Sequence, residues 1–182
     1  SGVLLAGVNI DSDRVKWMLD LDFPVVLFTQ QASDGKTKIN TVIHDNKKAV
    51  IDAVEFLAAN GHKRIAYISG PKEDYSSGTL RLQGFREAVD KLGLEIPESY
   101  ITIGDFSYDS GVKAMQRIYE ESMVLPTAVL ACCDMTAVGA QACIAKFGMK
   151  VPEDISVMGI DDSEVSMYVT PALSTVRIPY YD

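Results

Sequence analysis

The sequence predicts an α/β fold in which parallel strands are covered by helices on both faces. Short apolar runs, several of them rich in β-branched residues, alternate along the chain with amphipathic stretches of helical period. Strand–helix–strand repeats of this kind pair their strands in parallel through right-handed crossovers. The balance of 47% apolar and 23% charged residues is that of an ordinary globular protein. At 182 residues, the chain is long enough for one domain or for two small lobes.

The first 44 residues are expected to form a short α/β unit. The run at 24–28 (PVVLF) is apolar and β-branched, as a buried strand requires. Val15, Met18 and Leu19 share one face of a helix expected between the first two strands. In chain order, the expected elements are a strand at 3–8, a helix at 12–20, a strand at 24–28, a turn at 33–36 and a strand at 39–43.

A longer unit of five strands is expected to begin after His44. Asp45 precedes an apolar stripe at helical spacing and is the expected N-cap of a helix, which Asn60 and Gly61 end. No repeat or low-complexity run interrupts the pattern that follows. The further elements expected are strands at 64–69, 100–103, 127–131, 155–160 and 173–176, and helices at 80–92, 108–121 and 134–147.

The composition of the sequence restricts the binding partners and the cellular compartment that we expect for this protein. The 17 basic and 25 acidic residues give a formal net charge of −8, and phosphate contacts need a basic surface, so this chain alone is not expected to bind nucleic acid. No apolar run is long enough to span a membrane. Cys132, Cys133 and Cys143 cannot all pair and match no zinc spacing, so we expect free thiols, no metal site and a reducing, cytoplasmic compartment. Residues 1–5 lack signal-peptide features, and we expect the chain to be part of a longer protein.

Polar and aromatic residues follow the predicted strands at their carboxyl ends, where open α/β sheets bind ligands. A guanidinium donates in a fork and carboxylates accept from hydroxyls, so together with an aromatic ring they suit a polyhydroxylated small molecule. The residues at these positions are Thr29, Arg81, Asp105, Phe106, Cys132, Cys133, Asp134, Asp161, Asp162 and Ser163.

Simpler roles compete with ligand binding at some of these positions. Asp134 is more readily explained as a helix cap, and the Cys132–Cys133 pair as small core residues. No nucleotide-binding glycine motif, P-loop or G-x-S-x-G elbow is present, so no cofactor and no enzyme activity are expected. His44 has no nucleophile nearby in the sequence, and His62 lies at the opposite end of the predicted sheet. A hydrolase whose catalytic groups are carboxylates alone stays an open alternative, because the sequence does not show the distance between two such carboxylates.

Five segments, in order, resemble the lactose/galactose repressor family of bacterial transcription regulators. The resemblance covers roughly residues 24–180, and its specificity comes from the order of the segments and not from any one of them. The segments are 60–71 (NGHKRIAYISGP), 81–85 (RLQGF), 126–140 (PTAVLACCDMTAVGA), 151–162 (VPEDISVMGIDD) and 171–176 (PALSTV).

The resemblance implies a periplasmic-binding-protein-like fold of type I, with two α/β lobes and a small effector in the cleft between them. Residues 1–44 would be the C-terminal part of an incomplete N-terminal lobe, 45–178 the C-terminal lobe, and 179–182 the return crossover. The family's helix-turn-helix is not in this sequence, so operator DNA would be bound only through that absent segment.

The resemblance also implies an effector site. The arginine that grips the effector corresponds to Arg81, and the carboxylate that accepts from it corresponds to Asp161. A thiol and a threonine stand where the family often has better hydrogen-bonding side chains, which disfavours a simple hexose or galactoside. The implied effector-binding residues are Arg81, Asp161, Phe106, Cys133, Thr29 and Tyr180.

A homodimer is expected through the helix at 134–147. This helix is almost free of charge, and Val138 and Ala142 lie outside the stripe that its own core needs. Met167 and Tyr168 form a second apolar cluster, and together the four suggest an exposed interface patch. The resemblance places the same helix at a two-fold subunit contact.

The sequence therefore predicts the effector-sensing core of a cytoplasmic transcription regulator that binds a sugar or sugar derivative. The alternative is an extracytoplasmic sugar-binding protein of a transporter, which has the same fold. A phosphorylated carrier protein as a further partner, known in some relatives, stays open.

Overall fold

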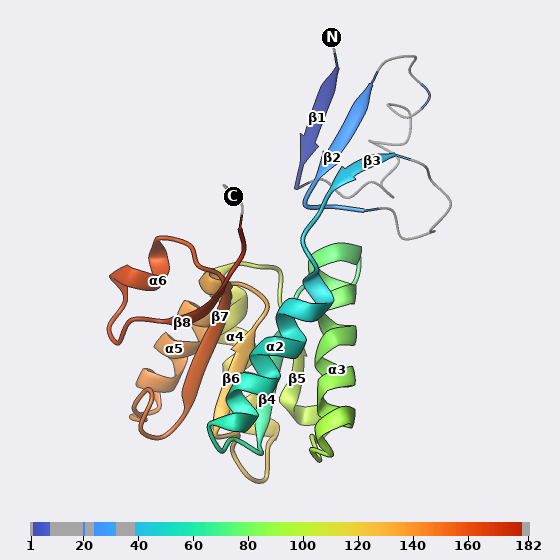
Figure 1. Cartoon of the computed structure of the whole chain (residues 1–182). Coiled ribbons are helices and arrows are strands. Elements are labelled where there is room, and N and C mark those ends of the chain that lie inside the picture. The colour runs from blue at the N-terminus through green and yellow to red at the C-terminus, as the bar shows by residue number, and fades with distance from the viewer. Residues whose placement is uncertain (1, 8–19, 21–23, 32–38, 180–182) are drawn as a thin grey trace.

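The computed structural model describes residues 2–7, 20, 24–31 and 39–179, and within them it forms two separate parallel sheets. Figure 1 shows the smaller sheet beyond one end of the larger, with the chain passing from β3 into α2 between them. The strand orders are β1-β2-β3 and β5-β4-β6-β7-β8. The strands are β1 (Val3–Ala6), β2 (Val25–Phe28), β3 (Asn40–Val42), β4 (Ile65–Ser69), β5 (Ile101–Ile103), β6 (Ala128–Ala131), β7 (Ser156–Asp161) and β8 (Ser174–Arg177).

Helices cover both faces of the larger sheet, which confirms the predicted fold class. Asp45 caps α2 as expected, because its carboxylate accepts from the Lys48 amide at 2.8 Å. None of the described helices is long and apolar enough to cross a membrane. The helices are α2 (Asn46–Ala59), α3 (Leu80–Leu92), α4 (Tyr108–Glu121), α5 (Asp134–Lys146) and α6 (Val165–Tyr168), with a π-helical turn, η1 (Tyr75–Thr79), and a 3₁₀ turn, η2 (Glu98–Tyr100).

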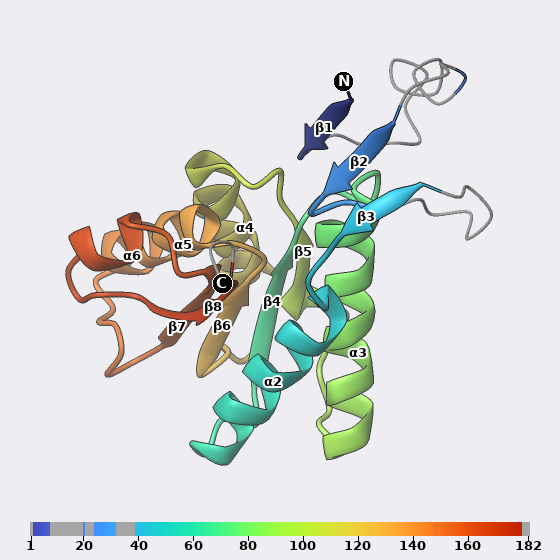
Figure 2. The same ribbon diagram turned by 45° about the horizontal axis from the view of Figure 1, so that its top comes forward.

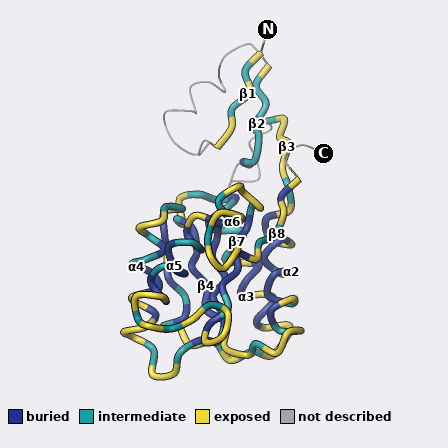
Figure 3. Tube along the Cα trace, turned by 90° about the vertical axis from the view of Figure 1, so that its left-hand side faces the viewer, coloured by how far each residue is buried: buried dark blue, intermediate teal, exposed yellow. Residues whose placement is uncertain are grey.

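The central strands β4 and β6 of the larger sheet are buried on both faces, and their side chains contribute to two hydrophobic cores. In β4, Ile65 and Tyr67 pack on the side of α2 and α3, whereas Ala66 and Ile68 pack on the side of α4 and α5. This alternation follows from the period of two along a strand, and it explains why β4 is a continuous apolar run. Figure 3 shows the buried trace running through the middle of this lobe.

The helix pair α4 and α5 is packed closely enough to require glycine. A Cβ on Gly111 of α4 would overlap the Thr136 carbonyl oxygen of α5, and a Cβ on Gly139 would overlap the Tyr108 carbonyl oxygen. The backbones of the two helices are therefore in direct contact at both points.

Several predicted boundaries were wrong by a few residues. The strand predicted at 3–8 ends at Ala6, because Gly7 turns the chain with φ +63°. The strand predicted at 39–43 is only Asn40–Val42, and the helix predicted to Phe147 ends one residue earlier. The predicted helix at 12–20 and turn at 33–36 lie outside the described residues, apart from Asp20. The turns η1 and η2 and the short helix α6 were not predicted.

Candidate functional site

A cavity of about 450 Å³ lies between the two sheets, at the carboxyl ends of their strands. In Figure 2, the arrowheads of β1 and β2, which mark their carboxyl ends, point toward the larger lobe. Gly7, Thr29 and Gln30 line the cavity from the loops after β1 and β2. The rest of the wall is His44, Asp74, Ser77, Arg81, Phe106, Cys133, Met135, Asp161 and Ser163.

Arg81 is held in place by groups of the protein itself. Its residue is 2% exposed, and its Nε donates to Asn46 Oδ1 at 2.7 Å. One terminal nitrogen donates to the Cys132 carbonyl, and the other lies 3.5 Å from Asp161 Oδ1. A buried guanidinium needs such partners, and here they fix the plane of the fork at the cavity wall.

His44 lies at the passage between the lobes and was not expected in the site. Its Nε2 lies 3.0 Å from Asn46 Oδ1. The same nitrogen is 3.4 Å from Arg81 Nη2. Burial, and then the charge of Arg81, lower the pKa of His44 below its ordinary value of 6.5. The ring is therefore neutral at pH 7 and adds no second cation beside the guanidinium.

Three of the lining residues hold left-handed backbone conformations at the end of a strand or within three residues after it. Thr29 has φ +68°, Phe106 has φ +69° and Asp161 has φ +120°. The Phe106 ring rests on Gly70, where a Cβ would lie only 2.5 Å from it. Non-glycine residues in this region are strained and are found mainly where surrounding contacts or function fix them. The turns aim these side chains at the cavity.

The two neighbouring cysteines lie in different surroundings, one in the core and one at the cavity. Cys132 is fully buried, as the core role predicted, whereas Cys133 is 8% exposed and lines the cavity. The Cys133 sulfur lies 3.3 Å from Thr136 Oγ1 and 3.4 Å from the Phe106 carbonyl oxygen. Hydrogen bonds from the Cys132 thiol and from Thr136 outweigh burial and lower the pKa of the Cys133 thiol to about 7.

Two hydrogen bonds join the lobes at the edge of the cavity. Gln30 Nε2 donates to Asp74 Oδ2 at 3.1 Å, and the Gln31 amide donates to Ser76 Oγ at 3.1 Å. The other oxygen of Asp74 accepts from the Ser77 amide at 2.7 Å and caps η1. Asp74 therefore couples the local structure of one lobe to the position of the other.

The structure brings five of the six predicted effector residues to this cavity: Arg81, Asp161, Phe106, Cys133 and Thr29. Tyr180 lies outside the described residues. Ser163 was among the residues expected at the strand ends, whereas sequence reasoning missed Gln30, Asp74 and Met135, because no signal in the sequence singled them out. His44 adjoins the expected lobe boundary, which was the one available signal for it.

Asp134 is not the helix cap that the sequence favoured. Cys133 occupies the cap position of α5, and Asp134 is 1% exposed in the first turn. Its carboxylate accepts from the Ser163 amide at 2.7 Å, from Ser163 Oγ at 2.8 Å and from Thr175 Oγ1 at 2.5 Å. It ties α5 to the loop after β7 and to β8, and so supports the segment that carries Asp161.

No cluster of metal-ligating side chains occurs among the described residues. His62 lies at the amino end of the larger sheet, as predicted, where its Nδ1 is 3.0 Å from Thr127 Oγ1. The groups that the cavity offers to a ligand include one guanidinium, carboxylates, an aromatic ring and a thiol.

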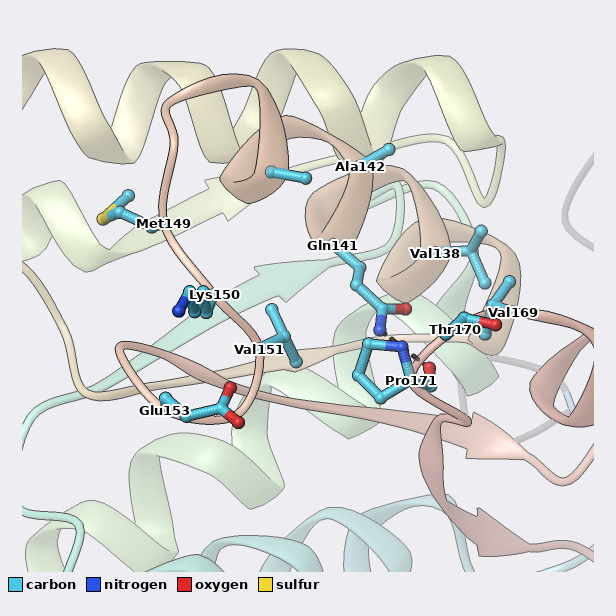
Figure 4. Close-up of a pocket in the computed structure, with 11 residues that line it drawn as sticks. Val138, Gln141, Ala142, Met149, Lys150, Val151, Glu153, Val169, Thr170 and Pro171 are labelled. Carbon is cyan, nitrogen blue, oxygen red and sulfur yellow. Dashed lines mark hydrogen bonds between the residues drawn. The ribbon is translucent and has the colours of Figure 1, made fainter.

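A second concave region, which we call the α5 groove, has a volume of about 490 Å³. Figure 4 shows Val138 and Ala142 on the helix facing the segment with Val169 and Pro171, and Gln141 reaching Pro171. Gln141 Nε2 donates to the Pro171 carbonyl at 2.9 Å, while its Oε1 is buried without a partner among the described residues. The predicted interface residues Val138 and Ala142 thus line one groove, and Met167 and Tyr168 stand beside it on α6, 68% and 73% exposed.

Two parallel sheets with a polar, aromatic-walled cavity between them define a two-lobed α/β arrangement, and open sheets of this kind have their ligand sites at the carboxyl ends of the strands. The chain belongs to the periplasmic binding protein-like domain family, which matches residues 54–182. This confirms the fold that the sequence predicted.

The curated relatives that this chain resembles include transcription regulators. The chain is 33% identical over 181 residues to catabolite control protein A of Priestia megaterium, covering 100% of this chain and 54% of that protein. It is 36% identical over 182 residues to the HTH-type transcriptional repressor CytR of Escherichia coli (strain K12), covering 100% of this chain and 52% of that protein. This chain thus spans about half the length of the curated relatives that it matches.

Solved structures agree with the sequence relatives. A complex of the transcriptional regulator CelR with cellobiose superposes with a TM-score of 0.90 at 36% identity, covering 98% of this chain and 54% of that chain. A regulatory protein of the LacI family from Chloroflexus aggregans gives a TM-score of 0.87 at 31% identity, covering 98% of this chain and 63% of that chain. The resemblance to lactose/galactose repressor-type regulators is confirmed.

Proposed function

We propose that this chain is the effector-sensing domain of a bacterial transcription regulator that works in the cytoplasm. It binds a small carbohydrate-like effector between its lobes without a cofactor and without turning the effector over. One observation carries this proposal: Arg81 is fixed at the wall of an inter-lobe cavity that also presents the carboxylates of Asp74 and Asp161. The regulator names of the relatives favour this function over that of a transporter's binding protein.

The chemistry of the cavity suits a polyhydroxylated ligand. Carboxylates accept hydrogen bonds from vicinal hydroxyls, and the guanidinium donates to hydroxyl or ring oxygens. The Phe106 ring supplies an apolar face for the carbon skeleton. The CelR relative holds cellobiose, so a neutral disaccharide is the first probe to use here.

Binding of the effector between the lobes also explains how it would change the arrangement of the two lobes. The lobes are joined across the cavity by the Gln30–Asp74 and Gln31–Ser76 hydrogen bonds. An effector that contacts both lobes stabilises one lobe arrangement over another, and the population shifts toward it. In a longer regulator, the lobe arrangement would set the spacing of two DNA-binding heads.

Calorimetric titration tests the effector site directly. A panel of neutral mono- and disaccharides that includes cellobiose identifies a binding sugar, and Arg81→Ala is then titrated with it. Loss of the guanidinium leaves buried acceptors and the ligand unsatisfied, so we expect a loss of about 1–3 kcal/mol, or roughly 5- to 150-fold in affinity. The matched control is Arg86→Ala on the same helix, whose side chain is 57% exposed and 3.8 Å from Glu98.

Unchanged affinity of Arg81→Ala would remove this residue from the effector site. Equal losses in Arg81→Ala and Arg86→Ala would indicate a general effect on folding, which circular dichroism of both variants separates from a local one.

We further propose a homodimer in which the α5 groove meets its own copy around a two-fold axis. Val138, Ala142 and Val169 supply apolar surface, and the exposed Met167 and Tyr168 extend it. Continuous exposed apolar surface of this kind is characteristic of an interface, and a two-fold contact requires a self-complementary patch.

Sedimentation of Val138→Glu tests the dimer. A carboxylate in the groove would be buried without a partner in the dimer, so the variant should sediment as a monomer at concentrations where the unmodified chain associates. Val124→Glu is the matched control, because Val124 is 59% exposed and lies away from the groove. A dimer that survives Val138→Glu unchanged would place the interface elsewhere.

A further inference from the structure

Two adjacent cysteines stand at the junction of β6 and α5, beside the guanidinium of the effector site. Cys132 is fully buried, and Cys133 is 8% exposed at the cavity wall. The third cysteine, Cys143, lies three turns further along α5 in the core between α4 and α5. The pair is therefore set apart from Cys143 both by position and by access to the cavity.

Both thiols of the pair face the same hydroxyl. Thr136 Oγ1 lies 3.3 Å from the Cys133 sulfur and 4.0 Å from the Cys132 sulfur. Neighbouring side chains along a regular strand point to opposite faces. Here β6 has ended at Ala131, and Cys133 is the cap residue of α5, so the turn of the chain brings the two sulfurs to one side.

The peptide that links the two cysteines is also an anchor of Arg81. The Cys132 amide donates to the Ile68 carbonyl at 2.8 Å, and the Cys133 carbonyl accepts from the Ala137 amide at 3.0 Å. Between these fixed points lies the Cys132 carbonyl, which accepts from a terminal nitrogen of Arg81. Any rotation of this one peptide moves the acceptor that holds the guanidinium.

The two thiols differ in reactivity. The hydrogen bond between them raises the pKa of Cys132, to which burial adds, and lowers the pKa of Cys133 to about 7. Cys133 is thus a substantial fraction thiolate at neutral pH, and the thiolate is the form that attacks an oxidant. Cys132 stays protonated beside it, in the position of a resolving thiol.

We propose that Cys132 and Cys133 form an oxidation site at which a hydroperoxide closes a disulfide between the two neighbouring residues and releases Arg81 from its anchor. The Cys133 thiolate attacks one peroxide oxygen, the O–O bond breaks, and a sulfenic acid and a hydroxide form. The Cys132 sulfur then attacks the Cys133 sulfur, the S–O bond breaks, and the departing hydroxide takes the Cys132 proton to form water. With hydrogen peroxide, two thiols and one peroxide give one disulfide and two waters.

Formation of a disulfide between the two neighbouring cysteines requires the backbone to move. Neighbouring Cα atoms are about 3.8 Å apart, whereas disulfides usually span roughly 4.4–6.8 Å. A trans peptide fixes this Cα distance, so a disulfide between the two residues is strained, and we expect the Cys132–Cys133 peptide to twist and to move its carbonyl away from Arg81. Strained disulfides are more easily reduced, so thiols should restore the original arrangement. The effect on the effector rests on the proposed function, whereas the chemistry at the thiols does not.

The chemistry is tested on the whole reduced chain with hydrogen peroxide, followed by intact-mass and peptide mapping without reductant. The expected product has lost two hydrogens, is monomeric, retains one free thiol at Cys143 and returns to the starting mass with dithiothreitol. Cys132→Ser should stop at a sulfenic acid that dimedone traps on Cys133, and Cys133→Ser should form no disulfide. Cys143→Ala is the matched control and should form the disulfide like the unmodified chain.

The release of Arg81 is measured without any effector, in NMR spectra of the reduced and oxidised chain, from the signal of the Nη1 hydrogens that donate to the Cys132 carbonyl. This signal should shift and exchange at least about ten-fold faster on oxidation, because a hydrogen-bonded anchor is lost. A sugar that binds the reduced chain should bind the oxidised chain at least about ten-fold more weakly.

Each step has an outcome that overturns it. Over-oxidation without a disulfide, or a disulfide that involves Cys143 or a second copy, would overturn the oxidation site. A disulfide that leaves the Arg81 signal unchanged would overturn the release. If the disulfide forms and the signal moves but no sugar of the panel binds even the reduced chain, the proposed function fails while the oxidation site stands.

Discussion

At the scale of single residues, the site consists of side chains that are fixed by contacts outside the cavity. Arg81 is held by Asn46, by the Cys132 carbonyl and by Asp161. Thr29 and Phe106 keep left-handed backbone conformations, which cost about 1–3 kcal/mol each and persist only where neighbours hold them. A site arranged before binding loses less entropy when the ligand arrives.

His44 gives a prediction for the pH dependence of stability. Burial, and then Arg81, lower the pKa of the folded-state ring below 6.5, so the unfolded chain takes up this proton first as the pH falls. The free energy of unfolding should therefore be at its full value above about pH 6.5 and should decrease as the pH falls below 6.5. Urea titrations across this range measure it, and His44→Gln should flatten the decrease.

The control for this experiment is His62→Gln. Burial also lowers the pKa of His62, but the charge of an arginine is not among the causes of this shift, and the ring contacts Thr127. His62→Gln should flatten the decrease less than His44→Gln does. An identical slope for His44→Gln and the unmodified chain would show that His44 titrates normally in the folded state.

At the scale of elements, α5 contributes residues to the core, to the cavity and to the α5 groove. Ala137, Ala140 and Ile144 are fully buried in the core, as the sequence predicted for its apolar stripe. Its first turn carries Met135 to the cavity, and Val138 lies in the α5 groove. A helix with apolar residues on more than one face has partners on more than one side. The low charge of this helix follows from these contacts.

The glycine contact between α4 and α5 gives a prediction for packing. In Gly111→Ala, the new methyl group meets the Thr136 carbonyl oxygen, which is part of the helix backbone and cannot move aside like a side chain. We expect a destabilisation of about 1–3 kcal/mol, seen as a lower urea midpoint with an unchanged slope. Lys113→Ala, an exposed position on the same helix, is the control and should shift the midpoint little. A Gly111→Ala variant as stable as the unmodified chain would show that the helices separate without cost.

At the scale of the whole molecule, the cavity lies between the two sheets, and residues from both of them line it. The described contacts between them include the Gln30–Asp74 and Gln31–Ser76 hydrogen bonds, and each lobe buries its own strands. Lobes joined by a few polar contacts move relative to each other more readily than lobes that share a core. This arrangement is the physical basis for coupling ligand binding to lobe position.

The net charge gives a prediction for DNA. A chain with a net charge of −8 repels the phosphate backbone, so it should not bind operator DNA by itself. In a gel shift at low salt, the DNA band should stay in place at protein concentrations that shift it fully for a basic control protein. Specific, salt-sensitive binding by this chain would contradict the prediction and would place a DNA-binding surface within it.

The sequence by itself determined the fold class and most of the order of elements. Periodicity of two and of 3.6 follows directly from strand and helix geometry, so β4 and α4 were predicted at nearly their observed bounds. The expectation that Arg81, from the segment after β4, and Asp161, at the end of β7, would face the same edge of the sheet followed from the rule that parallel strands present their carboxyl ends to ligands. These features depend on local pattern, which a sequence contains in full.

The tertiary structure alone decided which residues meet. Gln30 and Asp74 come from different lobes, and His44 reaches Arg81 across the passage between them. Asp134 carries a sequence pattern that fits a helix cap, and yet its carboxylate binds Ser163, which lies 29 residues away. Such contacts depend on the relative placement of distant elements, which packing of the whole core fixes and no local pattern encodes.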